Sequence, residues 1–166
     1  MNLIVAVDKN FGIGNESKLL YNIPEDMQHF KNLTINKVVI MGRSTLDSLP
    51  HSKPLKNRVN IVLTRDKNLE VDGAIILHSV EEVLAYIKQY NTDDVFIIGG
   101  ESIYREFLPY TKFAYLTKID SNKEANKYFE NLDKQKNWKL IDLSPTFEYN
   151  GTNYCFCTYE NKSVIL

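Results

Sequence analysis

The segment VFIIGGESIYREFLP, residues 95–109, decides how the fold of this chain is interpreted. Four apolar residues lead directly into the pair Gly99-Gly100, and a helical pattern runs from Glu101 until Pro109 ends it. A continuous apolar run of this length suits a strand that is buried on both faces, as in a parallel sheet. Ligands of such sheets bind beyond the carboxyl ends of the strands, where N–H groups of the next helix face an anion. Taken alone, the glycine pair is more simply explained by a tight strand-to-helix turn without a ligand.

The same pattern of strand and helix recurs along the chain. Helices are expected over residues 24–33, which begin with Pro24, and after Ser79, whose Ser-Val-Glu-Glu start resembles a capping box. Residues 138–143 and 154–159 look like antiparallel strands joined by a turn around Asn150-Gly151. This order predicts a single α/β domain over residues 1–166, with a central mainly parallel sheet, an antiparallel C-terminal strand and helices on both faces. The other expected strands are 3–7, 37–41, 59–63, 74–77, 95–98 and 113–117.

Composition narrows the classes of function. Apolar residues make up 43% of the chain, charged residues 25%, and the formal net charge is −1, so no overall field attracts nucleic acid or a membrane surface. The first apolar run, residues 3–7, is too short for a signal peptide or a membrane helix. Cys155 and Cys157 are two apart, which suits neither a disulfide nor a metal site. We therefore expect two free thiols, no metal and a cytoplasmic protein.

Two further strand ends carry groups that bind phosphate. Gly42 leads into Arg43-Ser44-Thr45, and another strand ends in Leu63-Thr64-Arg65. Guanidinium and hydroxyl groups are common partners of phosphate oxygens, so three such strand ends predict a phosphorylated nucleotide. For each arginine alone, a solvated surface charge is the simpler explanation. The standard dinucleotide fingerprint is missing, because Gly12-Ile13-Gly14 is followed by Ser17 and no helix, and the chain has no Walker motif.

Asp26 is the most informative acid of the chain. Helical spacing puts Ile23, Asp26, Met27 and Phe30 on one side of the first expected helix. An acid on such a face either complements the helix dipole or contacts a ligand in an apolar pocket. Spacing alone favours the first reading, although Glu25 is the more natural dipole partner. The histidines are scattered and predict no metal or catalytic cluster: His29, His51 and His78.

In this order the segments resemble dihydrofolate reductase, from residue 2 to about residue 159. The resemblance implies an eight-stranded sheet with an adenosine-binding subdomain near residues 38–88. It implies an NADPH-dependent oxidoreductase that converts 7,8-dihydrofolate to tetrahydrofolate for one-carbon metabolism and for thymidylate and purine synthesis, and a target of antifolate inhibitors. The matching motifs are Ala6-Val7-Asp8 with Ile13-Gly14, Asn22-Ile23-Pro24 with Asp26 and Phe30, Val39-Ile40-Met41-Gly42-Arg43 with Thr45, Arg58-Val59-Asn60-Ile61-Val62-Leu63-Thr64, Ile98-Gly99-Gly100 with Ile103-Tyr104, and Leu116-Thr117-Lys118-Ile119-Asp120.

The resemblance also assigns residues to the substrate. Asp26 is then the acid that pairs with the 2-amino group and ring N–H of the pterin, with a water delivering the proton to N5 after hydride transfer to C6. Thr117 supports this acid, and Arg58 binds the α-carboxylate of the glutamate tail. The implied catalytic residues are Asp26, Tyr21, Leu19 and Thr117. The implied substrate contacts are Ile4, Val5, Ala6, Asp26, Met27, Phe30, Lys31, Leu49, Leu55, Arg58, Ile98, Tyr104 and Thr117.

For the cofactor, the resemblance implies two helix starts that hold the pyrophosphate and a cis peptide between Gly99 and Gly100. Arg43, Thr64 and Arg65, with His78, recognise the 2′-phosphate, and residues 13–20 form a mobile loop over the nicotinamide. The implied cofactor contacts are Ala6, Ile13, Gly14, Asn15, Leu19, Gly42, Arg43, Ser44, Thr45, Leu63, Thr64, Arg65, His78, Ile98, Gly99, Gly100, Glu101, Ser102, Ile103 and Tyr104.

The chain departs from the family pattern at three places. Tyr21 stands where many relatives have Trp, which puts the expected water path near N5 in question. Ala125-Asn126 replaces a Gly-Asp pair that holds the closed loop in some relatives, and Glu101 must point away from the pyrophosphate. Two alternatives are a pyrimidine reductase domain of riboflavin synthesis, disfavoured by Asp26 and Arg58, and a nucleotide-binding sensor without turnover. We expect a monomer, because no helix carries a second apolar stripe.

Overall fold

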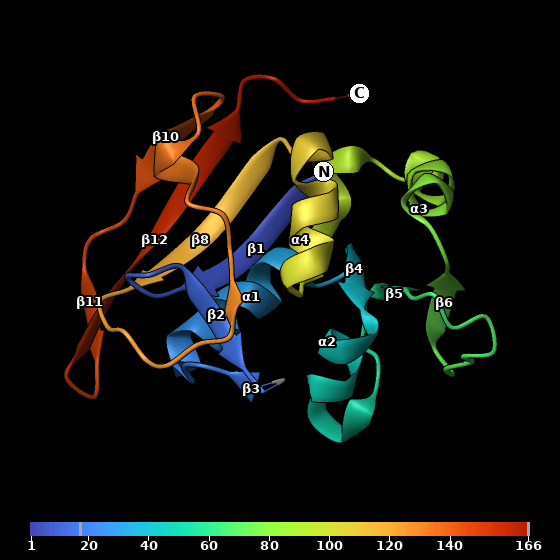
Figure 1. Ribbon diagram of the computed structural model, residues 1–166, viewed down its shortest axis with the longest axis horizontal. Helices are drawn as coiled ribbons and strands as arrows, with labels where there is room; N and C mark the ends of the chain where they lie inside the picture. Colours follow the sequence, from blue (N-terminus) through green and yellow to red (C-terminus); the bar gives the residue numbers. More distant parts are fainter. Residues whose placement is uncertain (17, 166) are drawn as a thin grey trace.

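The computed structural model describes residues 1–16 and 18–165 and has a central twisted sheet. Its strand order is β10-β12-β8-β1-β7-β4-β5-β6, with β11 attached to β12 (Figure 1). Neighbours from β8 to β6 are all parallel, whereas β12 and β10 are antiparallel to their neighbours. The predicted fold class is confirmed. The strands are β1 (Asn2–Val7), β4 (Val38–Gly42), β5 (Val59–Leu63), β6 (Ala74–Leu77), β7 (Val95–Gly99), β8 (Phe113–Ile119), β10 (Trp138–Leu143), β11 (Phe147–Tyr149) and β12 (Thr152–Asn161).

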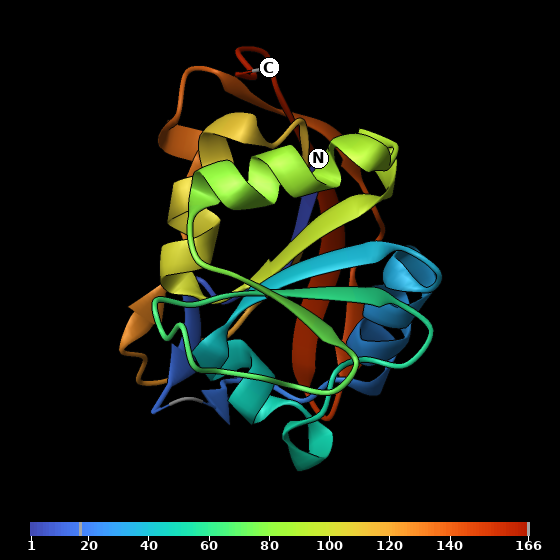
Figure 2. The same ribbon diagram turned by 90° about the vertical axis from the view of Figure 1, so that its right-hand side faces the viewer.

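Helices cover both faces of this sheet. The α-helices are α1 (Pro24–Thr34), α2 (Arg43–Ser48), α3 (Val80–Tyr86) and α4 (Glu101–Phe107). Figures 1 and 2 show α1 and α4 on opposite sides of the sheet. Short 3-10 helices complete the chain: η1 (Pro50–Ser52), η2 (Ile87–Gln89), η3 (Thr92–Asp94), η4 (Leu108–Tyr110) and η5 (Leu132–Lys134).

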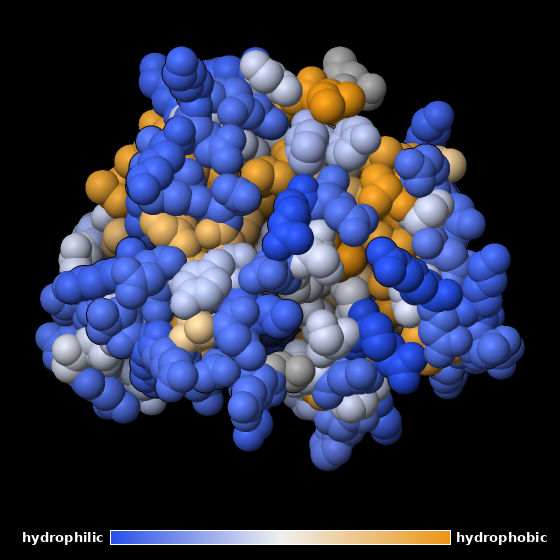
Figure 3. Space-filling view, viewed as in Figure 1, coloured by the Kyte–Doolittle hydropathy of each residue, from blue (hydrophilic) through white to orange (hydrophobic). Residues whose placement is uncertain are grey.

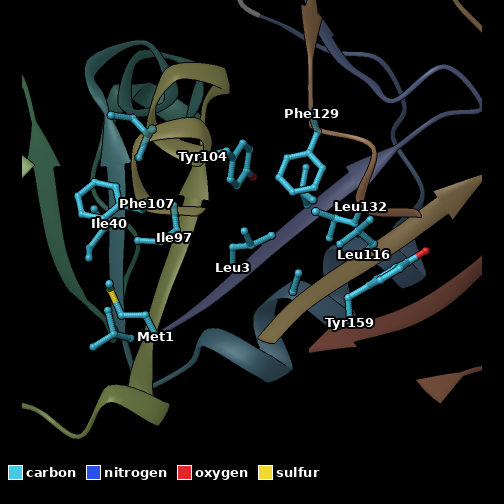
Figure 4. Packing of buried hydrophobic residues seen from close by; sticks show 14 of the residues in the cluster. Met1, Leu3, Ile40, Ile97, Tyr104, Phe107, Leu116, Phe129, Leu132 and Tyr159 are labelled. Carbon is cyan, nitrogen blue, oxygen red and sulfur yellow. The ribbon is translucent and has the colours of Figure 1, made fainter. Parts of the chain in front are cut away.

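The alternation of side chains along each strand divides the apolar residues into two main clusters. In β1, Leu3 and Val5 belong to the larger cluster, under α3 and α4, while Ile4 belongs to the cluster under α1 and α2. Successive side chains of a strand point to opposite faces, so each strand buried on both faces contributes to both clusters. The larger cluster includes Leu3, Ile97, Phe107 and Leu116, which Figure 4 shows packed together.

The helix starts follow from local sequence. Pro24 occupies the first turn of α1 together with the acids Glu25 and Asp26, where a missing N–H costs nothing and negative charge is favourable. The hydroxyl of Ser79 accepts a hydrogen bond from the N–H of Glu82 at 3.1 Å, so the predicted cap of α3 is confirmed.

A second, smaller sheet packs beside the main one, with the order β3-β2-β9. It consists of β2 (Gly12–Asn15), β3 (Lys18–Leu19) and β9 (Lys127–Tyr128). Residues 13–20 were expected as a mobile loop, and they contain β3 and most of β2; Ser17 lies outside the described residues. Strands this short are hidden from sequence patterns, because their pairing depends on β9 more than a hundred residues away.

The C-terminal hairpin differs from the predicted one. The turn at Asn150-Gly151 joins β11 to β12, so the prediction that it joins residues 138–143 to 154–159 is wrong. Positive φ angles of 49° at Asn150 and 79° at Gly151 suit a tight two-residue hairpin turn. Pro145 has no N–H for a ladder, and the Ser144 hydroxyl accepts from the N–H of Phe156 at 2.8 Å beside it. The long β12 therefore pairs with two shorter strands, β10 and β11.

The two cysteines are free, as the sequence analysis predicts. Cys155 and Cys157 are both free, and their sulfur atoms lie 3.8 Å apart on one side of β12. Figure 3 shows hydrophilic side chains over most of the face that carries α4. Among residues 1–16 and 18–165, no helix is long and apolar enough to cross a membrane.

Replacing Leu3 with alanine is expected to destabilise the fold strongly, because its side chain is 0% exposed and β1 lies in the middle of the main sheet. Leu-to-Ala changes in cores cost about 2–5 kcal/mol. Leu143→Ala is the matched control, since that side chain is 59% exposed, and we expect a loss below about 0.5 kcal/mol. Urea unfolding measures both variants. Equal losses would contradict this account of the core.

Candidate active site

Two glycine turns lie side by side at one edge of the main sheet. Strands β4 and β7 are parallel neighbours, with Met41 opposite Gly99, so the starts of α2 and α4 are adjacent. A Cβ atom on Gly42 would lie 3.0 Å from Cγ1 of Ile103, and Gly99 has a φ of 118° that other residues rarely adopt. The peptide bond between Gly99 and Gly100 is cis, as the resemblance implies. At these turns the glycines leave the backbone without side chains to cover it. The first N–H groups of both helices have no partner within their own helix.

The third strand end, that of β5, lies next to these turns. The Nδ1 atom of His78 is 2.9 Å from the carbonyl oxygen of Thr64, which brings the two predicted residues together. Arg43 is exposed, with Nε 3.4 Å from Asp47 and Nη1 3.7 Å from Asp66. Two acids thus compete with an anionic ligand for this guanidinium. Arg65 is exposed on the same loop.

The carboxyl group of Asp26 extends from α1 to the sheet, where β8 supplies a hydrogen-bond donor. The hydroxyl of Thr117 donates to Oδ1 of Asp26 at 2.5 Å, and Thr117 itself is buried opposite Ala6 of β1. Burial raises the pKa of Asp26, whereas the Thr117 hydrogen bond and the charge of His29 lower it, and the net direction is upward. The carboxyl group is thus held in one orientation and is easier to protonate than an exposed aspartate.

An apolar wall adjoins this acid. The cluster under α1 and α2 contains five of the predicted substrate contacts: Ile4, Phe30, Leu49, Leu55 and Ile98. Two other predicted contacts lie elsewhere. Met27 is 51% exposed, and the Val5 side chain belongs to the cluster on the opposite face of the sheet. Lys31 is exposed on α1.

Tyr104 connects the edge with the glycine turns to the apolar wall beside Asp26. Its buried hydroxyl donates to the carbonyl oxygen of Ile4 at 2.8 Å, which joins α4 to β1. Burial raises the pKa of Tyr104, so the hydroxyl stays protonated and remains a donor. The Ile4 carbonyl is thereby fixed at the point where the two predicted sites meet.

Arg58 lies along the same face of α1 as Asp26. The residues Asp26, Phe30 and Thr34 are four apart, which places them in one row on the helix. Arg58 donates through Nε to the Thr34 hydroxyl at 3.2 Å and through Nη1 to the Lys56 carbonyl at 2.8 Å, and its guanidinium carbon is 6.0 Å from the Phe30 ring centre. The row therefore has an acid at one end, apolar groups between and a fixed cation at the other end. It suits an elongated ligand with a donor-rich head and an anionic tail.

A sequence model of the dihydrofolate reductase family matches residues 1–161. The chain belongs to the dihydrofolate reductase family. It is 34% identical to the dihydrofolate reductase of Bacillus subtilis (strain 168) over 165 residues, which covers 98% of this chain and 95% of that one. It is 37% identical to that of Staphylococcus haemolyticus over 164 residues, covering 96% and 95%. A solved dihydrofolate reductase from Enterococcus faecalis, complexed with NADP(H) and RAB-propyl, superimposes with a TM-score of 0.87 at 31% identity, covering 96% and 95%.

These matches confirm the predicted family, activity and cofactor, so the chain is an NADPH-dependent dihydrofolate reductase. Its departures from the family pattern can now be placed. The Tyr21 hydroxyl donates to Oδ2 of the buried Asp8 at 3.4 Å, and Nζ of Lys123 lies 4.7 Å from the Tyr21 ring centre. Asp8 also accepts from the N–H of Gly12 at 2.8 Å. The polar tip of Tyr21 is thus occupied within the protein.

The second departure, at Ala125-Asn126, falls on the small sheet. Oδ1 of Asn126 accepts from the N–H of Glu16 at 3.3 Å, and the Asn126 N–H donates to the Gly14 carbonyl at 3.1 Å. Nδ2 of Asn15 donates to the Glu124 carbonyl at 3.1 Å. The acceptor is thus a neutral amide oxygen, which forms a weaker hydrogen bond than a carboxylate. Leu19, also in this sheet, is 71% exposed.

Sequence reasoning missed His29. Its ring stacks on Phe156 with the ring centres 4.1 Å apart, and it lies one turn from Asp26 on α1. Burial lowers the pKa of His29, and the charge of Asp26 raises it, with a net downward shift. The spacing of three residues from Asp26 was the one available signal, but the stacking partner comes from β12 and is invisible in the local sequence.

Thr117→Val is expected to raise the pKa of Asp26 further. The substitution keeps the shape of the side chain and removes the hydrogen bond that favours the ionised carboxylate. An NMR titration of the Asp26 carboxyl carbon in both proteins measures the effect. An unchanged or lower pKa in the variant would contradict the role given to Thr117.

Asp26→Asn is expected to increase the free energy of unfolding at pH 7. Because folding raises the pKa of Asp26, this group favours the folded state most at low pH, and that contribution is lost as pH rises through the folded pKa. The variant should therefore be more stable than the native protein at neutral pH, and its advantage should disappear below about pH 4. Urea unfolding across this range tests the sign. A variant that is less stable at pH 7 would refute it.

Proposed function

We propose that Asp26 is the residue with which this reductase orients and activates the pterin ring of 7,8-dihydrofolate. The proposal is carried by the hydrogen bond from Thr117 to Asp26 beside an apolar wall. An ionised carboxylate offers two acceptor oxygens, which match the 2-amino group and the adjacent ring N–H of the pterin. Such pairing fixes the plane and direction of the ring, so that one face of C6 is presented to the hydride donor.

Protonation of N5 is assigned to a water molecule rather than to direct transfer from Asp26. A carboxylate that pairs with the far edge of the pterin cannot reach N5, but its negative charge favours a protonated ring. We assign Tyr21 a part in ordering polar groups near the ring through its bond to Asp8.

The tail of the substrate is assigned to Arg58. A planar guanidinium binds a carboxylate through two parallel hydrogen bonds, and Nε and Nη1 of Arg58 already have partners within the protein. Those partners hold the group in place before the substrate arrives, which reduces the ordering cost of binding. The aminobenzoyl ring is assigned to the apolar stretch between Asp26 and Arg58.

NADPH supplies the hydride when it is bound. We assign its pyrophosphate to the glycine turns at Gly42 and Gly99-Gly100, where bare backbone and unpartnered helix N–H groups suit an anion. Residues 38–88 are proposed as the adenosine-binding subdomain. Thr64, Arg65 and His78, with Arg43, are proposed to recognise the 2′-phosphate. The hairpin of β2 and β3, in which the exposed Leu19 lies opposite Gly14, is proposed to cover the nicotinamide and exclude water.

We further propose that the protein acts as a cytoplasmic monomer that antifolates inhibit. All assigned residues lie in one chain, so the site is complete without a second copy. The two free thiols suit a reducing compartment. Antifolates that carry a protonated amidine-like group would pair with the same Asp26 carboxylate.

The first test is NADPH oxidation followed by absorbance at 340 nm. The native protein is expected to oxidise NADPH only when 7,8-dihydrofolate is present. Asp26→Asn should lose about 10²–10⁴-fold in rate near neutral pH, the usual contribution of acid–base catalysis. Glu25→Gln is the matched control, because this exposed acid lies one residue away on another face of α1. Binding of NADPH without oxidation by the native protein would contradict the proposed function.

A second test addresses the tail. Arg58→Gln is expected to raise the KM for 7,8-dihydrofolate by about tenfold or more, the loss expected for a charge-assisted hydrogen bond. The KM for a dihydropterin without a glutamate tail should not change. Lys56→Gln serves as a control, since Lys56 contributes its backbone carbonyl to Arg58 and its side chain is exposed. An equal rise in KM for both substrates would contradict the assignment of Arg58.

A further inference from the structure

Glu101 makes a contact that its position in the sequence does not predict. It is the first residue of α4, yet its carboxylate faces the small sheet rather than the edge with the glycine turns. Oε2 of Glu101 accepts a hydrogen bond from the backbone N–H of Tyr128 at 2.6 Å, and Oε1 accepts from Nη2 of Arg105 at 3.1 Å. The Glu101 side chain is only 26% exposed, whereas that of Arg105 is 62% exposed. The third departure from the family pattern is thus resolved by a defined partner.

Tyr128 belongs to the strand that supports the β2–β3 hairpin. In the register of the small sheet, Tyr128 of β9 lies opposite Gly12 and Lys127 lies opposite Gly14. The Tyr128 hydroxyl also donates to the carbonyl of Ala125 at 2.9 Å, which closes the loop before β9. A contact that fixes the position of Tyr128 therefore also restrains β2, the strand with which β9 pairs.

The hydrogen bond between Glu101 and Tyr128 spans a place where α4 and residues 128–131 are not closely packed. A cavity of about 210 Å³ lies between them, lined by Glu101, Tyr104, Arg105, Tyr128, Phe129, Glu130 and Asn131. Two of these lining residues, Tyr104 and Phe129, meet edge to face with their ring centres 5.3 Å apart (Figure 4). Because neighbouring side chains do not fill the gap, loss of the Glu101 bond would not be made up by existing contacts.

Charge gives a reason for this arrangement. A carboxylate at the first position of α4 would repel the pyrophosphate assigned to the same helix start. Its two hydrogen bonds, one to a backbone N–H and one to a guanidinium, spread that negative charge on the side away from the glycine turns. The acid is thereby used to fix β9 without opposing the cofactor.

We propose that Glu101 is a positioning residue that ties the β2–β3 hairpin, through Tyr128 of β9, to the helix start at which NADPH binds. This inference rests on the proposed function, in which the hairpin covers the nicotinamide. The start of α4, where the cofactor is proposed to bind, and the hairpin proposed to cover the nicotinamide are then physically connected. A purely local role, in which Glu101 only complements the dipole of α4, makes a different prediction.

Three variants separate these roles. Glu101→Ala removes both the charge and the acceptor, whereas Glu101→Gln removes the charge and keeps one acceptor oxygen. Glu106→Gln, an exposed acid on the same helix, is the matched control. Hydrogen exchange of the Tyr128 amide is measured by NMR without any ligand. The dissociation rate of NADPH and the single-turnover rate of hydride transfer to 7,8-dihydrofolate are then measured in each protein.

In Glu101→Ala, we expect protection of the Tyr128 amide to fall by at least about tenfold, as for loss of a hydrogen bond to a charged group. NADPH should then dissociate several-fold faster and hydride transfer should slow, with Glu101→Gln in between and Glu106→Gln unchanged. Unchanged Tyr128 protection in Glu101→Ala would overturn the proposal. So would slower NADPH release in both Glu101 variants, which is the result of charge repulsion alone. Failure of the native protein to oxidise NADPH would refute the proposed function and leave the amide measurement valid.

Discussion

The placement of one carboxylate between a helix and a sheet organises the rest of the molecule. A charged acid next to apolar side chains is unfavourable unless a donor satisfies it, and Thr117 supplies that donor to Asp26 from the middle of β8. For this bond to form, the first turn of α1 must lie against the strand pair β1 and β8, where Ala6 is in register with Thr117. The remaining length of α1 then lies beside the apolar cluster and ends at the Thr34–Arg58 contact.

The sheet topology connects the face proposed for the substrate to the edge proposed for the cofactor. Strand β1 is placed between β8, which carries Thr117, and β7, which ends in the glycine pair. The hydrogen bond from the Tyr104 hydroxyl to the Ile4 carbonyl joins α4 to the same strand, β1. Two ligands bound at these places meet at β1, which is what a direct transfer between them requires. Within the small sheet a hydrogen bond from the Glu16 N–H to the Asn126 side chain joins the β2–β3 hairpin to the segment before β9, and Glu101 attaches β9 to α4.

Sequence patterns predicted the parts of this structure that depend on local order. Apolar runs identified the parallel strands, and Pro24 and Ser79 marked helix starts that the structure confirms. The missed features depend on distant partners or on very short segments. Strands β2, β3 and β11 have two to four residues each, too few for a periodic signal. Likewise the stacking of His29 on Phe156 and the bond from Tyr128 to Glu101 join residues far apart in the chain. Spacing alone favoured a dipole role for Asp26, because it does not reveal Thr117.

The most direct test of the account is the pH dependence of hydride transfer in a single turnover with NADPH and 7,8-dihydrofolate. If the negative charge of Asp26 favours the protonated pterin, the rate should fall as pH rises through one ionisation, that of the pterin N5 whose pKa this charge raises. In Asp26→Asn, which lacks the charge, the same ionisation should move to lower pH. If the variant retains that ionisation at the same pH, another group controls the protonation and the account is wrong.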